Sequence, residues 1–458
     1  GVQTCALPIS QLLSLQERRA DLALAAGRPE EAGRVLRAYV DACEGYYGER
    51  SEHLARALSK QAEVAAELHH EQEAEALFGR SIGMQRGLGG QGAGPVLALT
   101  LRRRARFHLM AGRTDLAIKD LVEARAILEQ VHGTGSIRVA EIDLALVEAA
   151  VRAGDRILAR QAWDQARTAL DERFRELEGP AIPQAHAIPQ LVTDAVYWQV
   201  VLLRHDHPDS LSPDQQLELL RPGMQSLARN KGALLDEGSR LVLVGSQERL
   251  FDLALEIASE AEGNAQVRAE RFFQLAEMDR AILLKSRLNT FSSLRFTGVP
   301  DTLLRREAML LKTLKGEAED EAPLHDRQGM EEDLHELMAT LERDHPSYFA
   351  LRYGERPVTF AQVREALLTT GNALLEFAFT DTGLHALVLR TDTALLLRLP
   401  ARGLQEDVDR LNRAVADRQA APYLEAAHRL YRRLLAPLAP WLGGRELLIV
   451  PDGPLHRL

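Results

Sequence analysis

Apolar residues recur at helical spacing through most of the chain and change to strand spacing only near its end. The segments GRVLRAYV (33–40), LAIKDLVEARAIL (116–128) and VAEIDLALVEAAV (139–151) carry apolar residues every three or four positions, as one face of an α-helix does. After about residue 357 the pattern is one of short apolar runs separated by TDTG and TDT: ALLEFAF (373–379), LHALVLR (384–390) and ALLLRLP (394–400). These runs favour consecutive antiparallel strands.

A repeat occupies residues 10–178. Three segments place Ala five positions after a Gly, LAAGRPEEA (24–32), LMAGRTDLA (109–117) and VRAGDRILA (151–159), and AELHHEQEA (66–74) keeps the Ala but has His69 in place of Gly. Their alanines are spaced by 42, 43 and 42 residues, and a second series, Ala55, Ala98 and Ala140, is spaced by 43 and 42. Two markers at one period predict about four stacked helical pairs. Gly is expected to end each first helix in a left-handed conformation, and Ala to let the second helix approach closely.

The turn pattern and the loop segments YYGERSEHLA (46–55) and VHGTGSIRVA (131–140) resemble long tetratricopeptide (TPR) repeats. A period near 42 is also compatible with HEAT-like repeats. A TPR-type solenoid presents a groove that holds a peptide or a partner helix, so a protein or peptide partner is expected there. The alternative is that the repeats only support a neighbouring domain.

Residues 179–354 are expected to form a helical extension. GPAIPQAHAIPQ (179–190) interrupts the repeat, and FFQLAEMDRAILLKSRL (272–288) has the composition of a strongly apolar helix. Two amphipathic stretches, centred on Leu310 and Leu337, predict an antiparallel helical hairpin. KGEAEDEAPLHDRQG (315–329), with its acidic run at 317–321, is expected to be a solvated connection between them.

The last hundred residues predict the beginning of an α/β sheet. VTFAQVREALL (358–368) is a helix behind a Thr cap, and the three short runs follow as strands. A helix-length segment then ends in AAHRLYRRLLAPLAPWL (426–442), and LLIV (447–450) is apolar throughout, as in a strand covered on both faces. The order of strand, crossover helix and strand is typical of an α/β sheet.

ALLEFAFTDTGLHALVLR (373–390) and LYRRLLAPLAPWLGGRELLIVPDGPLHRL (430–458) resemble the opening of a CHAT domain, a caspase-like domain typically fused behind TPR repeats, mostly in bacteria. RAILLKSRLN (280–289), TGVPDTLLRRE (297–307) and ERDHPSYFAL (342–351) resemble its helical lead-in. The fold class implied is mainly α: a TPR-type α-solenoid followed by the N-terminal part of an α/β caspase-like domain, residues 355–458.

The resemblance implies that the parent protein is a cysteine endopeptidase acting on a protein substrate. In the family the catalytic His, in a His-Gly segment, and the catalytic Cys lie on later strands, so this chain is expected to lack the dyad. One alternative is a non-enzymatic TPR adaptor with a pseudoenzyme CHAT domain. Another is a purely helical adaptor, which predicts no strands after residue 370.

The charge, the apolar runs and the cysteines of the chain bear on which classes of function are expected. The net charge of −10 is spread along the chain without a basic stripe, which disfavours nucleic acid. No apolar run approaches the roughly 18 residues needed to cross a bilayer, so no membrane span is expected. Residues 1–9, GVQTCALPI, resemble the translation of a sequencing adapter and are expected to be a scar. Cys5 lies in it, which leaves Cys43, excludes a disulfide framework and favours a reducing cytoplasm.

No residue is assigned a catalytic, cofactor or metal role. Cys43 is expected to be packed in a repeat helix, and His456 precedes the position of the family's catalytic His. Asp381-Thr382-Gly383 spells the aspartic-protease triplet but lacks the second copy that this chemistry needs, so a strand turn is expected.

Two histidine groups are candidate metal ligands. His205-Asp206-His207 follows an apolar helix and precedes Pro208, so it is expected to be a helix-ending loop. His69-His70 likewise lacks further ligands at suitable spacing. The sequence contains no P-loop and no dinucleotide fingerprint, and no cofactor is expected.

Overall fold

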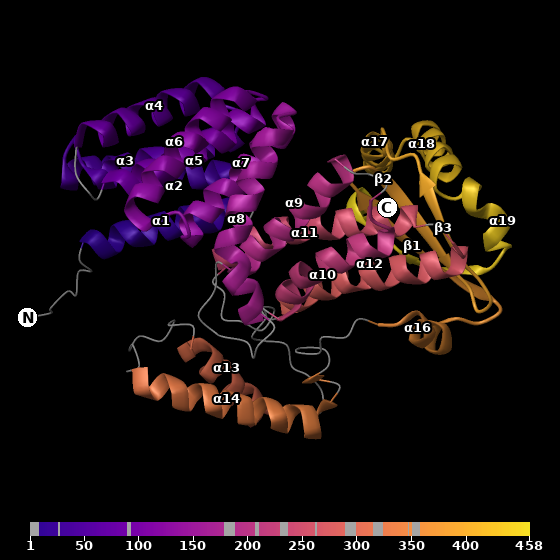
Figure 1. Cartoon of the computed structure of the whole chain (residues 1–458). Helices are drawn as coiled ribbons and strands as arrows, with labels where there is room; N and C mark the ends of the chain where they lie inside the picture. The colour runs from indigo at the N-terminus through magenta and orange to yellow at the C-terminus, as the bar shows by residue number, and fades with distance from the viewer. Residues whose placement is uncertain are drawn as a thin grey trace, which may run out of the picture. The chain divides into compact units, whose positions relative to one another are not determined.

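The computed structural model describes residues 9–25, 28–88, 93–177, 188–206, 210–229, 237–261, 263–288, 299–314, 324–346, 348–349 and 358–458. In these residues the chain is mainly helical, with one four-stranded sheet in its last hundred residues (Figure 1). The strands exclude the purely helical alternative. The expected scar, except its last residue, and most of the Pro-rich segment 179–190 and of the connection 315–329 lie outside the described residues.

Two compact units make up the chain, and each is described by itself. The first comprises Gly1–Asp206 with Leu235–Leu243, and the second comprises His207–Leu234 with Val244–Leu458. The helix that follows the repeats therefore belongs with them, whereas the remaining helices of the middle segment belong mostly with the sheet.

Successive helices pack against one another in the first unit. They are α1 (Ile9–Ala25), α2 (Pro29–Tyr47), α3 (Glu52–Glu67), α4 (Glu71–Leu88), α5 (Ala93–Met110), α6 (Thr114–His132), α7 (Ile137–Ala153), α8 (Arg156–Leu177) and α9 (Ile188–Asp206). The first eight form four pairs, each joined by a short turn, as the repeat predicts.

The four turns inside these pairs share one hydrogen bond. In each, the residue immediately before the second helix donates its N–H to a carbonyl five residues earlier: Arg28 to Ala23 (2.9 Å), His70 to Ala65 (2.8 Å), Arg113 to His108 (2.8 Å) and Asp155 to Ala150 (2.9 Å). The residue before the donor is left-handed in three of them: φ is 71° at Gly112, 77° at Gly154 and 59° at His69. This geometry is a helix C-terminal cap, and it confirms the predicted role of the glycines. Gly27 lies outside the described residues.

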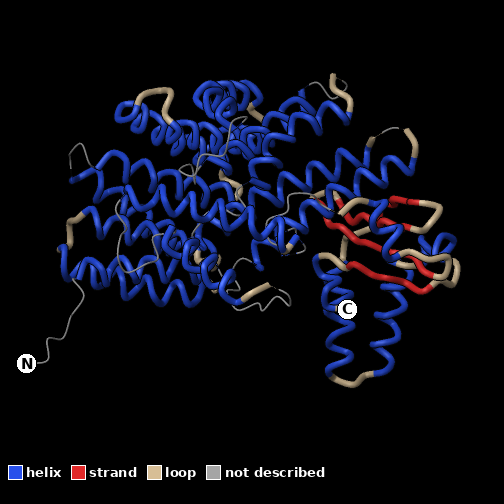
Figure 2. Tube along the Cα trace, turned by 90° about the horizontal axis from the view of Figure 1, so that it is seen from below, coloured by secondary structure: helices blue, strands red, loops and turns tan. Residues whose placement is uncertain are grey.

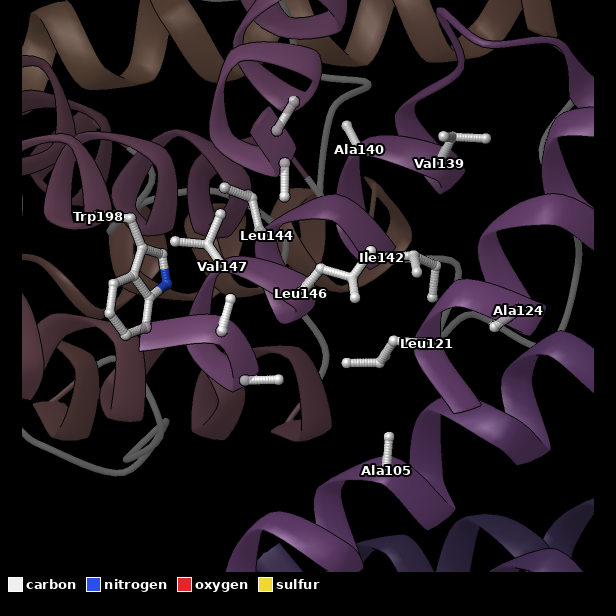
Figure 3. Close-up of a cluster of buried hydrophobic side chains, with 14 of the residues drawn as sticks. Ala105, Leu121, Ala124, Val139, Ala140, Ile142, Leu144, Leu146, Val147 and Trp198 are labelled. Carbon is white, nitrogen blue, oxygen red and sulfur yellow. The ribbon is translucent and has the colours of Figure 1, made fainter. Parts of the chain in front are cut away.

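The repeat alanines lie where helices touch. All seven have an exposed fraction of 0%: Ala32, Ala55, Ala74, Ala98, Ala117, Ala140 and Ala159. A larger side chain at these positions would push neighbouring helices apart. Figure 3 shows the core that results around α7, in which Trp198 of α9 lies beside Val147.

No helix in the described part of the chain is long and apolar enough to cross a membrane.

His69 allows a direct test of the turn geometry. The left-handed conformation costs an L-residue roughly 1–2 kcal/mol but costs Gly almost nothing. We predict that His69→Gly raises the free energy of unfolding of the first unit by about 1 kcal/mol, measured by urea denaturation. Gly112→Ala is the matched control and should lower the free energy of unfolding, because Ala is strained in the left-handed conformation. A methyl group at this position meets no neighbour within 4 Å, so the backbone strain is the only change. Loss of stability in His69→Gly would contradict the prediction.

The second unit combines helices with the sheet. Its helices are α10 (Pro213–Arg229), most of α11 (Glu237–Glu260), α12 (Ala265–Leu288), α13 (Asp301–Leu314), α14 (Leu324–Asp344), α16 (Phe360–Leu367), α17 (Leu404–Ala416), α18 (Ala420–Leu434) and α19 (Ala439–Leu442), with 3₁₀ turns η1 (Ala436–Leu438) and η2 (Gly453–Arg457). The strands are β1 (Asn372–Thr380), β2 (Gly383–Leu389), β3 (Ala394–Leu399) and β4 (Glu446–Val450).

Two helical predictions are confirmed here, and one boundary changes. Helices α13 and α14 pack through Leu310, Leu337 and Leu341. Thr359 caps α16 with a full capping box, as the Thr cap predicted. The expected connection 315–329 is shorter than predicted, because residues 324–329 already belong to α14.

The sheet has the order β3-β2-β1-β4, with β1–β2 and β2–β3 antiparallel and β1–β4 parallel. Figure 2 shows its strands in red, with helices packed beside them. Alternating residues point to its two faces. On one face Leu374 and Leu387 pack with Phe272 and Phe273 of α12. On the other face Leu375 packs with the group that α17 and α18 contribute. Helices therefore cover both faces of the sheet, as the order of strand, helix and strand predicted.

Strand β4 differs from the fully covered strand that was expected. Leu447, Leu448 and Val450 are only partly buried, and Ile449 is 52% exposed. The physical reason is its place at the edge: β1 pairs with one side of β4, and no other strand among the described residues pairs with the second.

An apolar strand with one free edge is a template for pairing with another chain. We predict that the chain self-associates as its concentration rises, measured as weight-average mass by light scattering. Ile449→Lys should reduce this association, because a charge on an edge strand opposes pairing. Leu424→Lys, at a more exposed apolar residue of α18, is the matched control and should leave the association unchanged. A stable monomer at all concentrations would refute the prediction.

Candidate functional site

The parallel strands β1 and β4 end at the same edge of the sheet, which is where open α/β sheets place their ligand sites. The turn after β4 is tied to β1 there. Asp452 accepts hydrogen bonds from the backbone N–H of Phe379 (2.7 Å) and from that of Gly453 (2.9 Å). Gly453 has φ of 51°, and a Cβ on it would lie 3.0 Å from the Phe379 ring. The Pro-Asp-Gly segment is therefore a fixed turn that needs its glycine.

A buried ion pair joins this sheet to α12. Glu376 lies in the middle of β1 with an exposed fraction of 1%, and Arg280 of α12 pairs with its Oε1. The same guanidinium donates to the carbonyl of Phe377 (2.7 Å) and contacts Glu277 (3.2 Å). Burial raises the pKa of Glu376 to about 7, although Arg280 opposes the rise. The guanidinium of Arg280 thus pairs with two carboxylates and donates a hydrogen bond to a strand carbonyl.

Further carboxylates of α12 and α11 extend from this pair, since Asp279 lies near Arg280 and Asp252 lies near Asp279. Burial raises the pKa of Asp279 to about 6, although Gln247 donates a hydrogen bond to it (2.8 Å). Burial, with the nearby charges of Asp381 and Asp279, raises the pKa of Asp252 to about 8. Glu256 accepts a hydrogen bond from the backbone N–H of Thr382 (3.0 Å). We call Asp252, Asp279, Glu376 and Asp452 the carboxylate cluster.

Groups whose pKa values are shifted by burial and by like charges mark candidate functional sites. Carboxyl groups that hold a proton near neutral pH can donate hydrogen bonds and transfer protons. The cluster thus has acid–base capacity. In the part of the chain that the structure describes, no group of three or more His, Cys, Asp and Glu residues is placed to hold a metal ion.

His385 lies on the same face of the sheet as Glu376. It is buried against Phe272, with ring centroids 5.2 Å apart, and its Nε2 lies 3.4 Å from the Thr380 hydroxyl. Burial, with a smaller effect from Arg398, lowers its pKa to about 4. The imidazole is therefore neutral at physiological pH and packs as part of the core.

Cys43 lies in α2 and is fully buried. Burial raises the pKa of its thiol, which opposes thiolate formation. His456 is an exposed residue of η2, and Asp381-Thr382-Gly383 forms the β1–β2 turn, as predicted.

The histidine groups do not converge with the carboxylate cluster. His70 contacts Glu73 (3.4 Å) in the second turn of the repeat unit. His205 lies at the end of α9 beside Asp206, which pairs with Arg160 (2.6 Å), and His207 lies outside the described residues.

The run RRRAR (102–106) in α5 is the densest basic stretch of the repeats, and the structure neutralises it. Each arginine has a carboxylate partner on a neighbouring helix: Arg102 with Glu141 (2.9 Å), Arg103 with Glu63 (3.4 Å), Arg104 with Asp120 (2.6 Å) and Arg106 with Glu67 (3.3 Å). These four arginines therefore pair with carboxylates inside the stack of helices.

No family model and no curated protein matches this chain.

Sequence reasoning missed the carboxylate cluster. Glu376 offered one signal, because it interrupts an otherwise apolar strand, ALLEFAF, and a buried carboxylate requires a partner. Asp252 and Asp279 offered none, since both lie in helices where an acidic residue is ordinarily solvated.

The raised pKa values predict an unusual pH dependence. At pH 5 to 8 the folded unit retains protons that the unfolded chain, with carboxyl pKa values near 4, has released. The carboxyl groups of Glu376, Asp279 and Asp252 therefore make stability fall as pH rises. They outnumber His385, whose lowered pKa acts in the opposite direction below about pH 6.5. We expect β1 and β2 to exchange their amide hydrogens faster at pH 8 than at pH 5, after correction for the intrinsic rate.

The isosteric variant Glu376→Gln replaces one titrating carboxyl group by an amide that does not titrate, so it should reduce the pH dependence of exchange. Glu365→Gln, at an exposed residue of α16, should leave it unchanged. Stability of the strands that rises between pH 5 and pH 8, or a pH dependence that Glu376→Gln leaves unchanged, would contradict the prediction.

Proposed function

We propose that the chain is a protein-interaction scaffold of TPR type joined to the N-terminal portion of a caspase-like CHAT domain. The observation that carries this proposal is the parallel pairing of β1 with β4. A β-hairpin and the helices α17 and α18 lie between these strands in the chain, and helices lie on both faces of the sheet. This arrangement is what the resemblance of residues 373–390 and 430–458 implies.

The uniform turns and the buried alanines support the TPR part of the proposal. Successive helical pairs of one period form a surface made of equivalent helices, here α1, α3, α5 and α7. Its charged residues are largely paired with one another, including Arg56 with Glu17 (2.9 Å) and Lys60 with Asp21 (2.7 Å). Exposed Leu22 and Leu99 lie on the same set of helices. Apolar anchors among neutralised charges favour a peptide or a partner helix as ligand.

We further propose that the parent protein is a cysteine endopeptidase. In that reaction a thiolate attacks the scissile carbonyl carbon, a His gives its proton to the leaving amine, and water hydrolyses the resulting thioester. The buried Cys43 is not placed for this chemistry. The nucleophile and its His would come from residues beyond those described here. The carboxylate cluster and the Asp452 turn would then hold the sheet edge to which those residues attach.

The decisive experiment starts from the complete reading frame in the source DNA. We predict a His-Gly segment and a strand-end Cys downstream of Leu458. The full-length protein should generate new N-termini in a protein substrate, detected by mass spectrometry, and replacement of that Cys by Ala should abolish them while binding of the partner persists.

A complete frame without either residue would refute the peptidase. It would favour the second candidate, a non-enzymatic adaptor with a pseudoenzyme CHAT domain. Binding of a partner by the repeats would then be the activity to measure.

A further inference from the structure

The third helical pair, α5 and α6, departs from the other three at one buried position. Five residues before the N–H donor of the shared turn hydrogen bond, the pairs carry Ala23, Ala65, His108 and Ala150 in order, and all four side chains are buried. The backbone carbonyl of each accepts the shared turn hydrogen bond. An imidazole thus occupies a site that takes only a methyl group elsewhere in the stack.

The partner of His108 on α6 is exceptional as well. Its Nε2 lies 3.6 Å from Oδ2 of Asp120, which is the third residue after the repeat alanine. The other pairs carry Val35, Leu77 and Ala162 at that place. Asp120 is buried, and Arg104 of α5 binds both of its carboxylate oxygens, at 2.7 and 2.6 Å. The third pair is therefore joined by an ionic cluster where the others pack hydrocarbon side chains.

The carboxylate of Asp120, which faces His108, already pairs with one cation. Asp120 already receives two hydrogen bonds from Arg104, and Nδ1 of His108 is buried with no hydrogen-bond partner among the described residues. The charged groups that face His108 are Arg104 on its own helix, Asp120 on α6, Arg113 at the turn and Glu75 on α4. Burial is the largest influence and lowers the pKa of His108. Arg113 and Arg104 act in the same direction, whereas Asp120 and Glu75 oppose the fall without reversing it.

We propose that the third helical pair is a pH-sensitive contact, closed while His108 is neutral and loosened when acidification places a proton on it. The proton would convert a neutral ring inside the α5–α6 interface into a buried cation, and separation of the two helices would return that cation to water. The sign follows from linkage. Because folding disfavours the charged ring, the stabilisation is present above the pKa of an unfolded His, near 6.5, and is lost as pH falls below it. This response is opposite in sign to that of the carboxylate cluster, so the two are separable on one sample.

Hydrogen exchange of the whole chain at pH 7.5 and pH 5, corrected for the intrinsic rate, tests the proposal. We expect protection of peptides within 94–132 to fall by roughly tenfold for each pH unit below about 6.5, the pKa of an unfolded His, because there the open state binds a proton that the closed state does not. Peptides within 52–88, from the second pair, should change less. His108→Ala restores the residue of the other three pairs, and His108→Gln keeps a polar side chain of similar size without a titrating ring. Both variants should lose the acid response of α5 and α6.

His70→Ala, which removes an exposed histidine of the second pair, is the matched control and should keep the response. If the acid response of residues 94–132 persists in both His108 variants, or if the original chain shows no acid response there, the proposal is wrong. Because both variants are read as a difference between two pH values, a constant change in stability does not affect the result.

Discussion

Close contact between helices at seven alanine side chains is the constraint on which the first unit depends. Each is fully buried and recurs with the period of the repeat. The contact requires each second helix to return at the same angle, and the shared turn supplies that angle through one backbone hydrogen bond. His69 adopts the same left-handed conformation as Gly112 and Gly154. Packing along the whole pair thus outweighs the local strain at a single residue.

In the second unit the corresponding constraint is a buried ion pair between a helix and a strand. Arg280 reaches from α12 to Glu376 and to the carbonyl of Phe377 in β1, so it ties helix to strand. Breaking a buried pair by removing one partner ordinarily costs about 3–5 kcal/mol. Burial raises the pKa values of the neighbouring Asp252 and Asp279 as well, and like charges nearby act in the same direction. The stability of this edge of the sheet therefore depends on pH.

Of the fold, the local elements were predictable. The strands of the β1–β3 meander begin and end within one residue of the expected runs, the capped helix at Thr359 is present, and the glycines turn as expected. The candidate site was less predictable. Asp381 was expected in a turn and lies in one, but the electrostatic influence of its carboxylate on Asp252 joins residues more than a hundred positions apart. No periodicity encodes such a contact.

The sequence by itself determined the repeat, its turns and the change from helix to strand, because these depend on backbone preferences and on apolar spacing within a few residues. Only the tertiary structure decided which charged side chains form ion pairs and which carboxyl groups are buried. RRRAR (102–106) is a basic patch in sequence and a set of ion pairs in space, and Glu376 is a polar interruption in sequence and the centre of a buried cluster in space. The physical reason is that desolvation and Coulomb energy depend on distance through space, whatever the separation along the chain.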